Sequence, residues 1–184
     1  MNPFFFVRIP RCASTGMKYG LGLPNTYDHK KAATFIEEEG RDKWDNSFTF
    51  SFVRNPWERL VSWYFYASKV CNTPGVNYPE KEMDFDTWIR TGCRHHWSHR
   101  PENPLKQVDW LVADGQVAVE FVGRFENVKE GWAYVCSRLG VQKEMCVRER
   151  SPHDDYRTYY TDETAKVVAT LFAEDIETFG YNFG

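Results

Sequence analysis

The sequence lacks several features that mark other classes of protein. No apolar run approaches the roughly 18 residues of a membrane-spanning helix, and residues 1–9 do not resemble a signal peptide. The five cysteines give an odd count without a C-x-x-C pair, so a disulfide framework is not indicated. A net charge of −3 argues against a nucleic-acid partner. These absences favour a protein of a reducing compartment, and we expect it in the cytoplasm.

Apolar and aromatic residues are plentiful. Hydrophobic residues make up 42% of the chain and aromatic residues 17%, which is enough for a well-packed core. The length of 184 residues fits one domain, and we expect residues 1–184 to form it. No internal repeat interrupts this organisation.

Hydrophobic periodicity predicts strands alternating with helices. Residues 47–53 alternate phenylalanine with polar residues, as a strand does, and helical spacing follows from Trp57 after an Asn-Pro helix start. Other apolar patterns predict strands over 4–9, 109–113 and 117–123, the last two around an Asp-Gly turn at 114–115. Helices are predicted from Ser14 and over 30–39, 84–91, 126–139 and 161–172, and loops over 71–82, 92–104 and 148–156.

This alternation predicts an α/β domain with a central, mainly parallel sheet flanked by helices. Ligands of such sheets bind beyond the carboxyl ends of the strands. Two polar turns, residues 10–16 and 54–56, follow predicted strands directly. The sequence therefore places a candidate site at this edge of the sheet.

The first turn has the composition of an anion-binding loop. Small residues allow several backbone N–H groups to face an anion, Arg11 adds a positive charge, and the Ser14 and Thr15 hydroxyls add donors. The alternative is a simple strand-to-helix turn capped by Ser14. A Walker A loop, G-x-x-x-x-G-K-[ST], is absent from the sequence.

The second turn combines a cation with a hydroxyl. Arg54 stands at the strand end and Ser62 lies in the following helix, a combination that can bind one phosphate. The alternative is that Arg54 pairs with Glu58 and that Ser62 lies on the surface.

Taken together, these segments resemble the sulfotransferases that use 3′-phosphoadenosine 5′-phosphosulfate (PAPS), in particular the carbohydrate sulfotransferase branch. Residues 9–15 (IPRCAST) match the pattern I-P-K-x-(A/G)-S-T, and residues 52–64 match F-V-R-(D/N)-P-x-x-R-L-x-S-x-Y. Residues 121–127 match F-V-G-R-(F/Y)-E-(N/D), and residues 156–181 also resemble the end of the family's domain. The resemblance implies a P-loop-like three-layer domain and a sulfuryl transfer from PAPS to a hydroxyl, most typically of a glycan, without a metal.

The resemblance also implies roles for single residues. The 5′-phosphosulfate is assigned to Arg11, Cys12, Ala13, Ser14, Thr15 and Gly16, the 3′-phosphate to Arg54 and Ser62, the adenine to Phe125, and closure over the nucleotide to a loop with Arg148, Arg150 and Ser151.

Two catalytic roles depend on the same resemblance. The first is a positive charge that stabilises the departing phosphate. The family usually has lysine where this chain has Arg11, and Lys18 is the alternative source of this charge. His29 is the candidate base that takes the acceptor proton, because similar sequences also carry a histidine in this region. The alternative for His29 is a surface residue at a helix start.

Other functions remain open at this point. Cys93, His95, His96 and His99 could hold a metal, but their spacing matches no standard site. Their segment could instead be a basic loop that contacts the acceptor, or a solvated loop. A small-molecule kinase with a degenerate phosphate loop and a non-catalytic nucleotide-binding module are the alternative functions.

Overall fold

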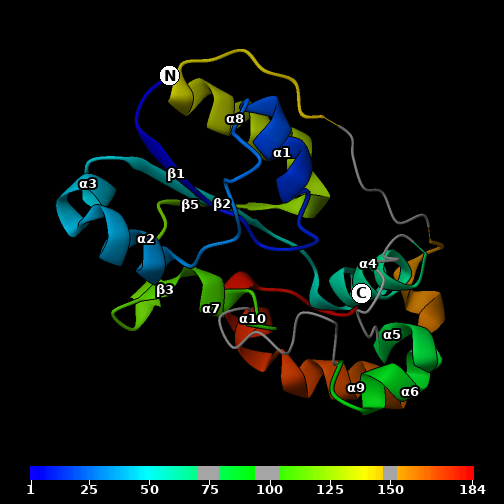
Figure 1. Ribbon diagram of the computed structural model, residues 1–184. Coiled ribbons are helices and arrows are strands. Elements are labelled where there is room, and N and C mark those ends of the chain that lie inside the picture. The colour runs from blue at the N-terminus through cyan, green and yellow to red at the C-terminus, as the bar shows by residue number, and fades with distance from the viewer. Residues whose placement is uncertain (70–78, 94–103, 147–152) are drawn as a thin grey trace. The chain divides into compact units, whose positions relative to one another are not determined.

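The computed structural model describes residues 1–69, 79–93, 104–146 and 153–184 (Figure 1). The chain forms two compact units, and each is built from two separate stretches. The first combines Met1–Arg54 with Gln107–Arg148, and the second combines Asn55–Lys106 with Glu149–Gly184. That residues 1–184 act as one domain stays a prediction.

The centre of the first unit is a parallel sheet of β1 (Phe4–Val7), β2 (Phe48–Val53) and β5 (Phe121–Arg124), in the order β1-β2-β5. All residues of β2 are buried, as expected for a middle strand covered on both faces. Phe6 stacks on its register partner Phe50, with ring centroids 4.6 Å apart. The other elements are α1 (Ser14–Gly20), α2 (Ala32–Glu39), α3 (Arg41–Asp45), α7 (Val108–Leu111), β3 (Val112–Ala113), β4 (Gln116–Val117), η1 (Phe125–Asn127) and α8 (Val128–Leu139).

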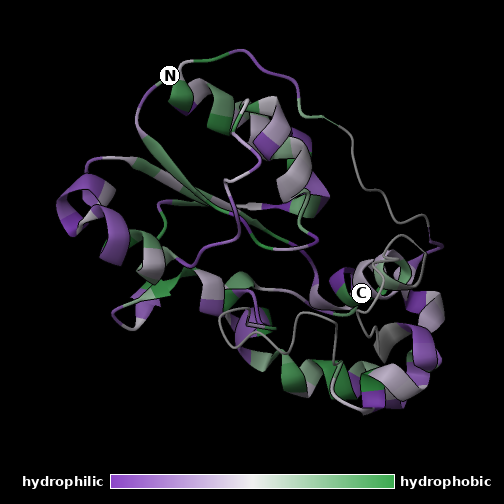
Figure 2. Ribbon diagram, in the orientation of Figure 1, coloured by the Kyte–Doolittle hydropathy of each residue, from purple (hydrophilic) through white to green (hydrophobic). Residues whose placement is uncertain are grey.

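Helices cover both faces of this sheet (Figure 1). Gly131 of α8 packs against the ring of Phe52 on one face, where an added Cβ atom would lie 2.7 Å from the ring. On the other face, Phe35 of α2 and Trp44 of α3 contact Phe5, with ring centroids 5.3 and 5.1 Å apart. Figure 2 shows the strands largely in green and much of α2 and α3 in purple. This layering confirms the predicted α/β class with a central parallel sheet.

One predicted strand is wrong and another is divided. The strand predicted over 117–123 corresponds to β4 and β5, which lie in different sheets, and residues 118–120 between them are not in a strand. The sequence predicts a strand over 109–113, but α7 occupies most of this segment and only β3 is extended. The apolar residues of α7 are buried, and a short buried apolar run does not distinguish a helix from a strand. The predicted turn is confirmed, since Asp114 and Gly115 join the antiparallel strands β3 and β4 with φ values of 52° and 77°.

The described part of the second unit consists of helices around an aromatic core. Trp57 and Trp63 of the predicted helix after the Asn-Pro turn are buried with Trp88 and Phe172. The predicted loop over 71–82 is wrong at its end, where residues 79–82 form a helical turn that begins at a proline. The elements are α4 (Pro56–Lys69), α5 (Pro79–Glu82), α6 (Phe85–Arg90), η2 (Tyr156–Tyr159), α9 (Asp162–Leu171) and α10 (Ala173–Phe179).

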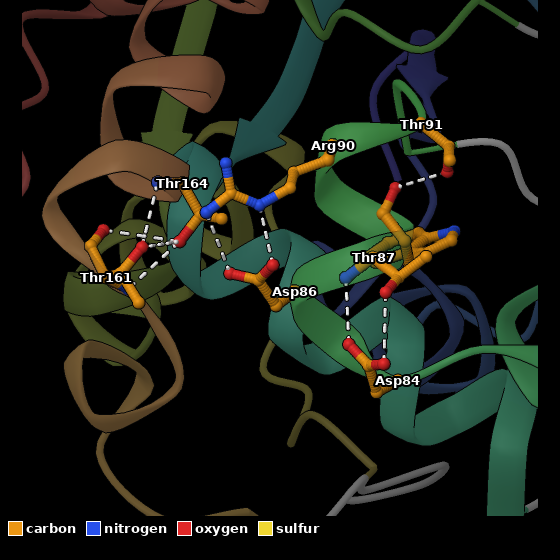
Figure 3. Close-up of polar contacts among 8 residues, drawn as sticks. Asp84, Asp86, Thr87, Arg90, Thr91, Thr161 and Thr164 are labelled. Carbon is orange, nitrogen blue, oxygen red and sulfur yellow. Dashed lines mark hydrogen bonds and ion pairs between the residues drawn. The ribbon is translucent and has the colours of Figure 1, made fainter.

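Side-chain caps fix where two of these helices begin (Figure 3). The Asp84 carboxylate accepts the backbone N–H of Thr87 at 2.9 Å and so starts α6. Thr161 and Thr164 form a reciprocal capping box at the start of α9. Both starts agree with the predicted helices over 84–91 and 161–172.

Candidate active site

The loop between β1 and α1 turns sharply at two residues that are not glycine. Arg11 and Ala13 have φ values of 67° and 60°, in the left-handed region that side chains rarely adopt. Cys12 between them is fully buried, and Ser14 is buried at the start of α1. The predicted strand, loop and helix are confirmed. Such strained conformations cluster at functional sites, where the surrounding structure holds them in place.

Arg54 lies beside this loop. It directly follows β2, is buried, and donates a hydrogen bond from Nη1 to the backbone oxygen of Arg11 at 3.3 Å. Its guanidinium carbon lies 3.9 Å from the centroid of the Phe125 ring. Because β1, β2 and β5 are parallel, all three of these residues follow the carboxyl ends of their strands. The structure thus brings together three residues that the resemblance assigns to one nucleotide.

A residue that the sequence did not single out, Gln107, joins these segments. Its Oε1 accepts the backbone N–H of Arg54 at 2.9 Å, and its Nε2 donates to the backbone oxygen of Arg54 at 2.8 Å. The Cys12 thiol lies 3.3 Å from the same Oε1. Gln107 is fully buried. A glutamine at the edge of a polar stretch is usually exposed, so no local pattern indicates this role.

His29 is tied to the start of the loop. Its Nδ1 lies 2.7 Å from the backbone oxygen of Arg8, the residue directly after β1. A carbonyl oxygen only accepts, so Nδ1 carries the hydrogen and the lone pair of the neutral ring is at Nε2. Burial of the ring, aided by the positive charge of Arg8, lowers the pKa of His29 to about 4. The ring is therefore neutral at pH 7, in the form that can accept a proton.

Tyr27 and Arg8 hold the segment that carries His29 against the edge strand β1. The Tyr27 hydroxyl accepts the backbone N–H of Phe6 at 3.0 Å and donates to the backbone oxygen of Phe6 at 3.1 Å. Nη1 of Arg8 donates to the backbone oxygen of Tyr27 at 2.5 Å. Burial raises the pKa of the Tyr27 hydroxyl to about 12, which keeps it protonated as a donor.

Three further residues of interest, Thr15, Gly16 and Lys18, lie in α1. A Cβ atom at Gly16 would collide with the backbone oxygen of Cys146, so this glycine permits close backbone packing of α1. Lys18 is buried, with its Nζ 5.0 Å from the centroid of the Tyr19 ring. Thr15 is half-buried. Gly16 thus has a packing reason as well as its predicted place in the loop.

The remaining predicted site residues lie elsewhere. Ser62 is on α4 of the second unit and is buried, so its alternative as a surface serine is wrong. Its joint contact with Arg54 stays a prediction, because the two residues belong to different units. Arg148, Arg150 and Ser151 lie outside the described residues.

The described part of the chain gives little support to the suggested metal site. His95, His96 and His99 lie outside it, and Cys93 is buried with a pKa raised to about 12 by that burial. Among the described residues, no group of three or more histidine, cysteine or acidic side chains could hold a metal ion. The same residues include no helix that is both long and apolar enough to cross a membrane.

Two arginines beyond the carboxyl edge of a parallel sheet are typical of α/β proteins that bind anions. A model of the sulfotransferase family matches residues 2–182, and the chain belongs to that family. This confirms the resemblance seen in the sequence and the prediction of a PAPS-dependent sulfotransferase. Membership in the carbohydrate branch stays a prediction.

Individual proteins are similar to the chain as well. An uncharacterized protein of Archaeoglobus fulgidus is 29% identical over 116 residues, which cover 63% of this chain and 87% of that protein. The crystal structure of mouse sulfotransferase SULT7A1 in complex with PAP matches with a TM-score of 0.56 and 13% identity, over 95% of this chain and 84% of that one. This structural similarity supports the α/β fold.

Proposed function

We propose that the chain transfers the sulfuryl group of PAPS to a hydroxyl of a carbohydrate acceptor. The observation that carries this proposal is the contact of Arg54 with both the Arg11 loop and the Phe125 ring, in a member of the sulfotransferase family. Two arginines and an aromatic ring supply what a nucleotide with phosphates at both ends requires. The mouse structure, which has a similar fold, contains PAP.

Each part of the donor is assigned to particular residues of the chain. The first loop binds the 5′-phosphosulfate, Arg54 with Ser62 binds the 3′-phosphate, and Phe125 contacts the adenine. Arg54 covers one face of the half-buried Phe125 ring, which leaves the adenine the other face or the ring edge. The resemblance assigns closure over the nucleotide to Arg150, which lies outside the described residues. The residues of the first loop are Arg11, Cys12, Ala13, Ser14, Thr15 and Gly16.

The chemistry follows from charge. The acceptor oxygen forms a bond to sulfur while the bond from sulfur to the 5′-phosphate oxygen breaks, and PAP (3′-phosphoadenosine 5′-phosphate) leaves with the bonding electrons. Negative charge grows on the leaving oxygens, where the Arg11 guanidinium stabilises it. Nε2 of His29 takes the acceptor proton, since the hydrogen bond from Nδ1 to Arg8 fixes the tautomer that accepts there.

The carbohydrate acceptor can be tested directly. The test is transfer of labelled sulfate from PAPS to a panel of glycans and small hydroxyl compounds, with a chelator of divalent metals present. We expect labelled glycan to form, because Arg11 and Arg54 supply the positive charge. Transfer only to small compounds would refute the glycan. A strict need for Mg²⁺ in the binding of PAP, measured on the same protein, would favour a kinase. Binding of PAP without any transfer would favour a non-catalytic module. The cytoplasmic location stays a prediction.

The Arg54→Ala variant tests the assigned 3′-phosphate site. We expect it to weaken PAP binding by about 1.5–3 kcal/mol, roughly 10- to 160-fold in Kd, the range for hydrogen bonds to a charged group. The Ser62→Ala variant loses only a neutral hydroxyl and should cost less. Isothermal titration calorimetry with PAP measures both effects.

A matched control exists in the same unit. Arg138 also stacks on a phenylalanine, with its guanidinium carbon 4.3 Å from the centroid of the Phe48 ring, but Phe48 lies at the opposite end of β2. The Arg138→Ala variant removes the same chemistry without touching the candidate site. Equal PAP affinities in the Arg54→Ala, Ser62→Ala and Arg138→Ala variants would remove the 3′-phosphate assignment.

A further inference from the structure

We infer that Gln107 is a positioning residue for the nucleotide: its side-chain amide holds the backbone of Arg54 beside the first loop. The inference rests on the proposed function, in which Arg54 binds the 3′-phosphate. It adds a residue that lies in none of the sequence motifs.

The contact of Gln107 with Arg54 resembles one step of a β ladder. β2 and β5 pair up to Val53 and Arg124, and Arg54 is the first residue beyond that ladder. There the Gln107 amide replaces a neighbouring strand, because it accepts from the Arg54 N–H at 2.9 Å and donates to the Arg54 C=O at 2.8 Å. A side-chain amide carries both a donor and an acceptor, as a peptide group does.

The same amide oxygen reaches the first loop. The Cys12 thiol lies 3.3 Å from Oε1 of Gln107, and Cys12 sits between the two residues with left-handed backbone conformations. Arg54 in turn donates from Nη1 to the backbone oxygen of Arg11. Gln107 thus holds the backbone of Arg54, which carries the guanidinium. Through Cys12 it also holds the first loop, in which the backbone oxygen of Arg11 accepts a hydrogen bond from that guanidinium.

Burial makes this arrangement sensitive to the side chain at position 107. Gln107 is fully buried and Arg54 is 6% exposed, so water cannot readily replace a lost bond to the Arg54 backbone. Methionine has nearly the shape of glutamine without its donor and acceptor. Asparagine keeps the amide on a stem that is one methylene shorter, so it cannot reach all three partners.

The experiment compares two ligands, PAP and 5′-AMP, which lacks the 3′-phosphate. Gln107 makes two amide hydrogen bonds to the Arg54 backbone but only one contact, with a weakly donating thiol, to the loop that would bind the 5′-phosphate of both ligands. The Gln107→Met variant should therefore lose about tenfold in PAP affinity and no more than about twofold in 5′-AMP affinity, so that the preference for PAP falls. The Gln107→Asn variant keeps a polar group in the buried site, which protects folding. Its ratio of PAP affinity to 5′-AMP affinity should fall about threefold. In steady-state assays, KM for PAPS should rise more than kcat falls.

The Val135→Ala variant serves as the control for stability. Val135 is a fully buried residue of α8 in the same unit. Its truncation should lower the melting temperature without changing the first loop or the turn that carries Arg54. If Gln107 were important only for folding, its variants and the Val135→Ala variant would weaken both ligands alike. That outcome, or an unchanged preference for PAP in both Gln107 variants, overturns the inference.

The Arg54→Ala variant separates the inference from the proposed function. If it abolishes the preference for PAP and the Gln107 variants do not, the proposed function stands and the role of Gln107 is refuted. If the Arg54→Ala variant keeps the full preference, the 3′-phosphate assignment fails, and the role of Gln107 fails with it. Loss of the preference in all three variants supports both.

Discussion

Replacing Arg11 with alanine is expected to lower kcat by roughly 10²- to 10³-fold, the effect of removing one preorganised donor from developing negative charge. Arg11 lies in the loop that is assigned to the 5′-phosphosulfate, and its guanidinium is the charge assigned to the leaving oxygens. Alanine is a better choice than glycine, because at a φ of 67° glycine would also relieve backbone strain. Single-turnover rates with labelled PAPS report the chemical step directly.

Lysine at position 11 is the matched variant. The family usually has lysine there, so the Arg11→Lys variant keeps the charge and loses only the planar fork. We expect it to retain most of the activity that the Arg11→Ala variant loses. A kcat within about threefold of the original in the Arg11→Ala variant would contradict the assignment. The Lys18→Ala variant would then be tested next, since Lys18 is the alternative source of charge.

The His29→Ala variant should lower turnover by about a hundredfold or more, the usual contribution of a general base, with PAP affinity nearly unchanged. The pH dependence is the sharper test. Because the pKa of His29 is about 4 in the free protein, the ring becomes protonated, and so unable to accept a proton, only when the pH falls to that value. kcat/KM should therefore stay level from pH 8 to about 5 and fall near pH 4. The negative charges of a bound donor raise the pKa, so kcat should fall at a higher pH.

The control for this variant is another histidine. His153 lies in the second unit, where its Nδ1 is 2.7 Å from the backbone oxygen of Asp154, and the His153→Ala variant should turn over normally. A near-normal rate in the His29→Ala variant would contradict the role as base. His95, His96 and Glu58 would then be the next candidates. Alternatively, a loose transition state, by analogy with phosphoryl transfer, would need no strong base.

The sequence predicted the elements whose pattern is periodic. Alternating phenylalanines indicated β2, and the Asn-Pro turn with helical spacing indicated α4, because both signals depend on neighbouring residues alone. Residues 109–113 were assigned wrongly, since a single buried turn of helix has no periodicity to detect. Tertiary packing decided that segment.

The sequence and its family resemblance pointed to the site residues but not to their contacts. Arg54 follows β2 and Phe125 follows β5. The strand order β1-β2-β5 makes these strands neighbours and so places the Arg54 guanidinium over the Phe125 ring. The lowered pKa of His29 arises from burial and from Arg8, which no local pattern encodes. Gln107 was missed because its role depends on partners that are distant in the sequence.

The discontinuous make-up of the two units constrains how the chain is completed on the ribosome. β1 and β2 emerge before the first stretch of the other unit, residues 55–106, whereas β5 and α8 of the same unit emerge only after it. At roughly 5–20 residues per second, the phenylalanines of β2 stay uncovered for several seconds. Exposed aromatic strands attract other chains during such a delay. We therefore expect this chain path to create a demand for chaperones during synthesis.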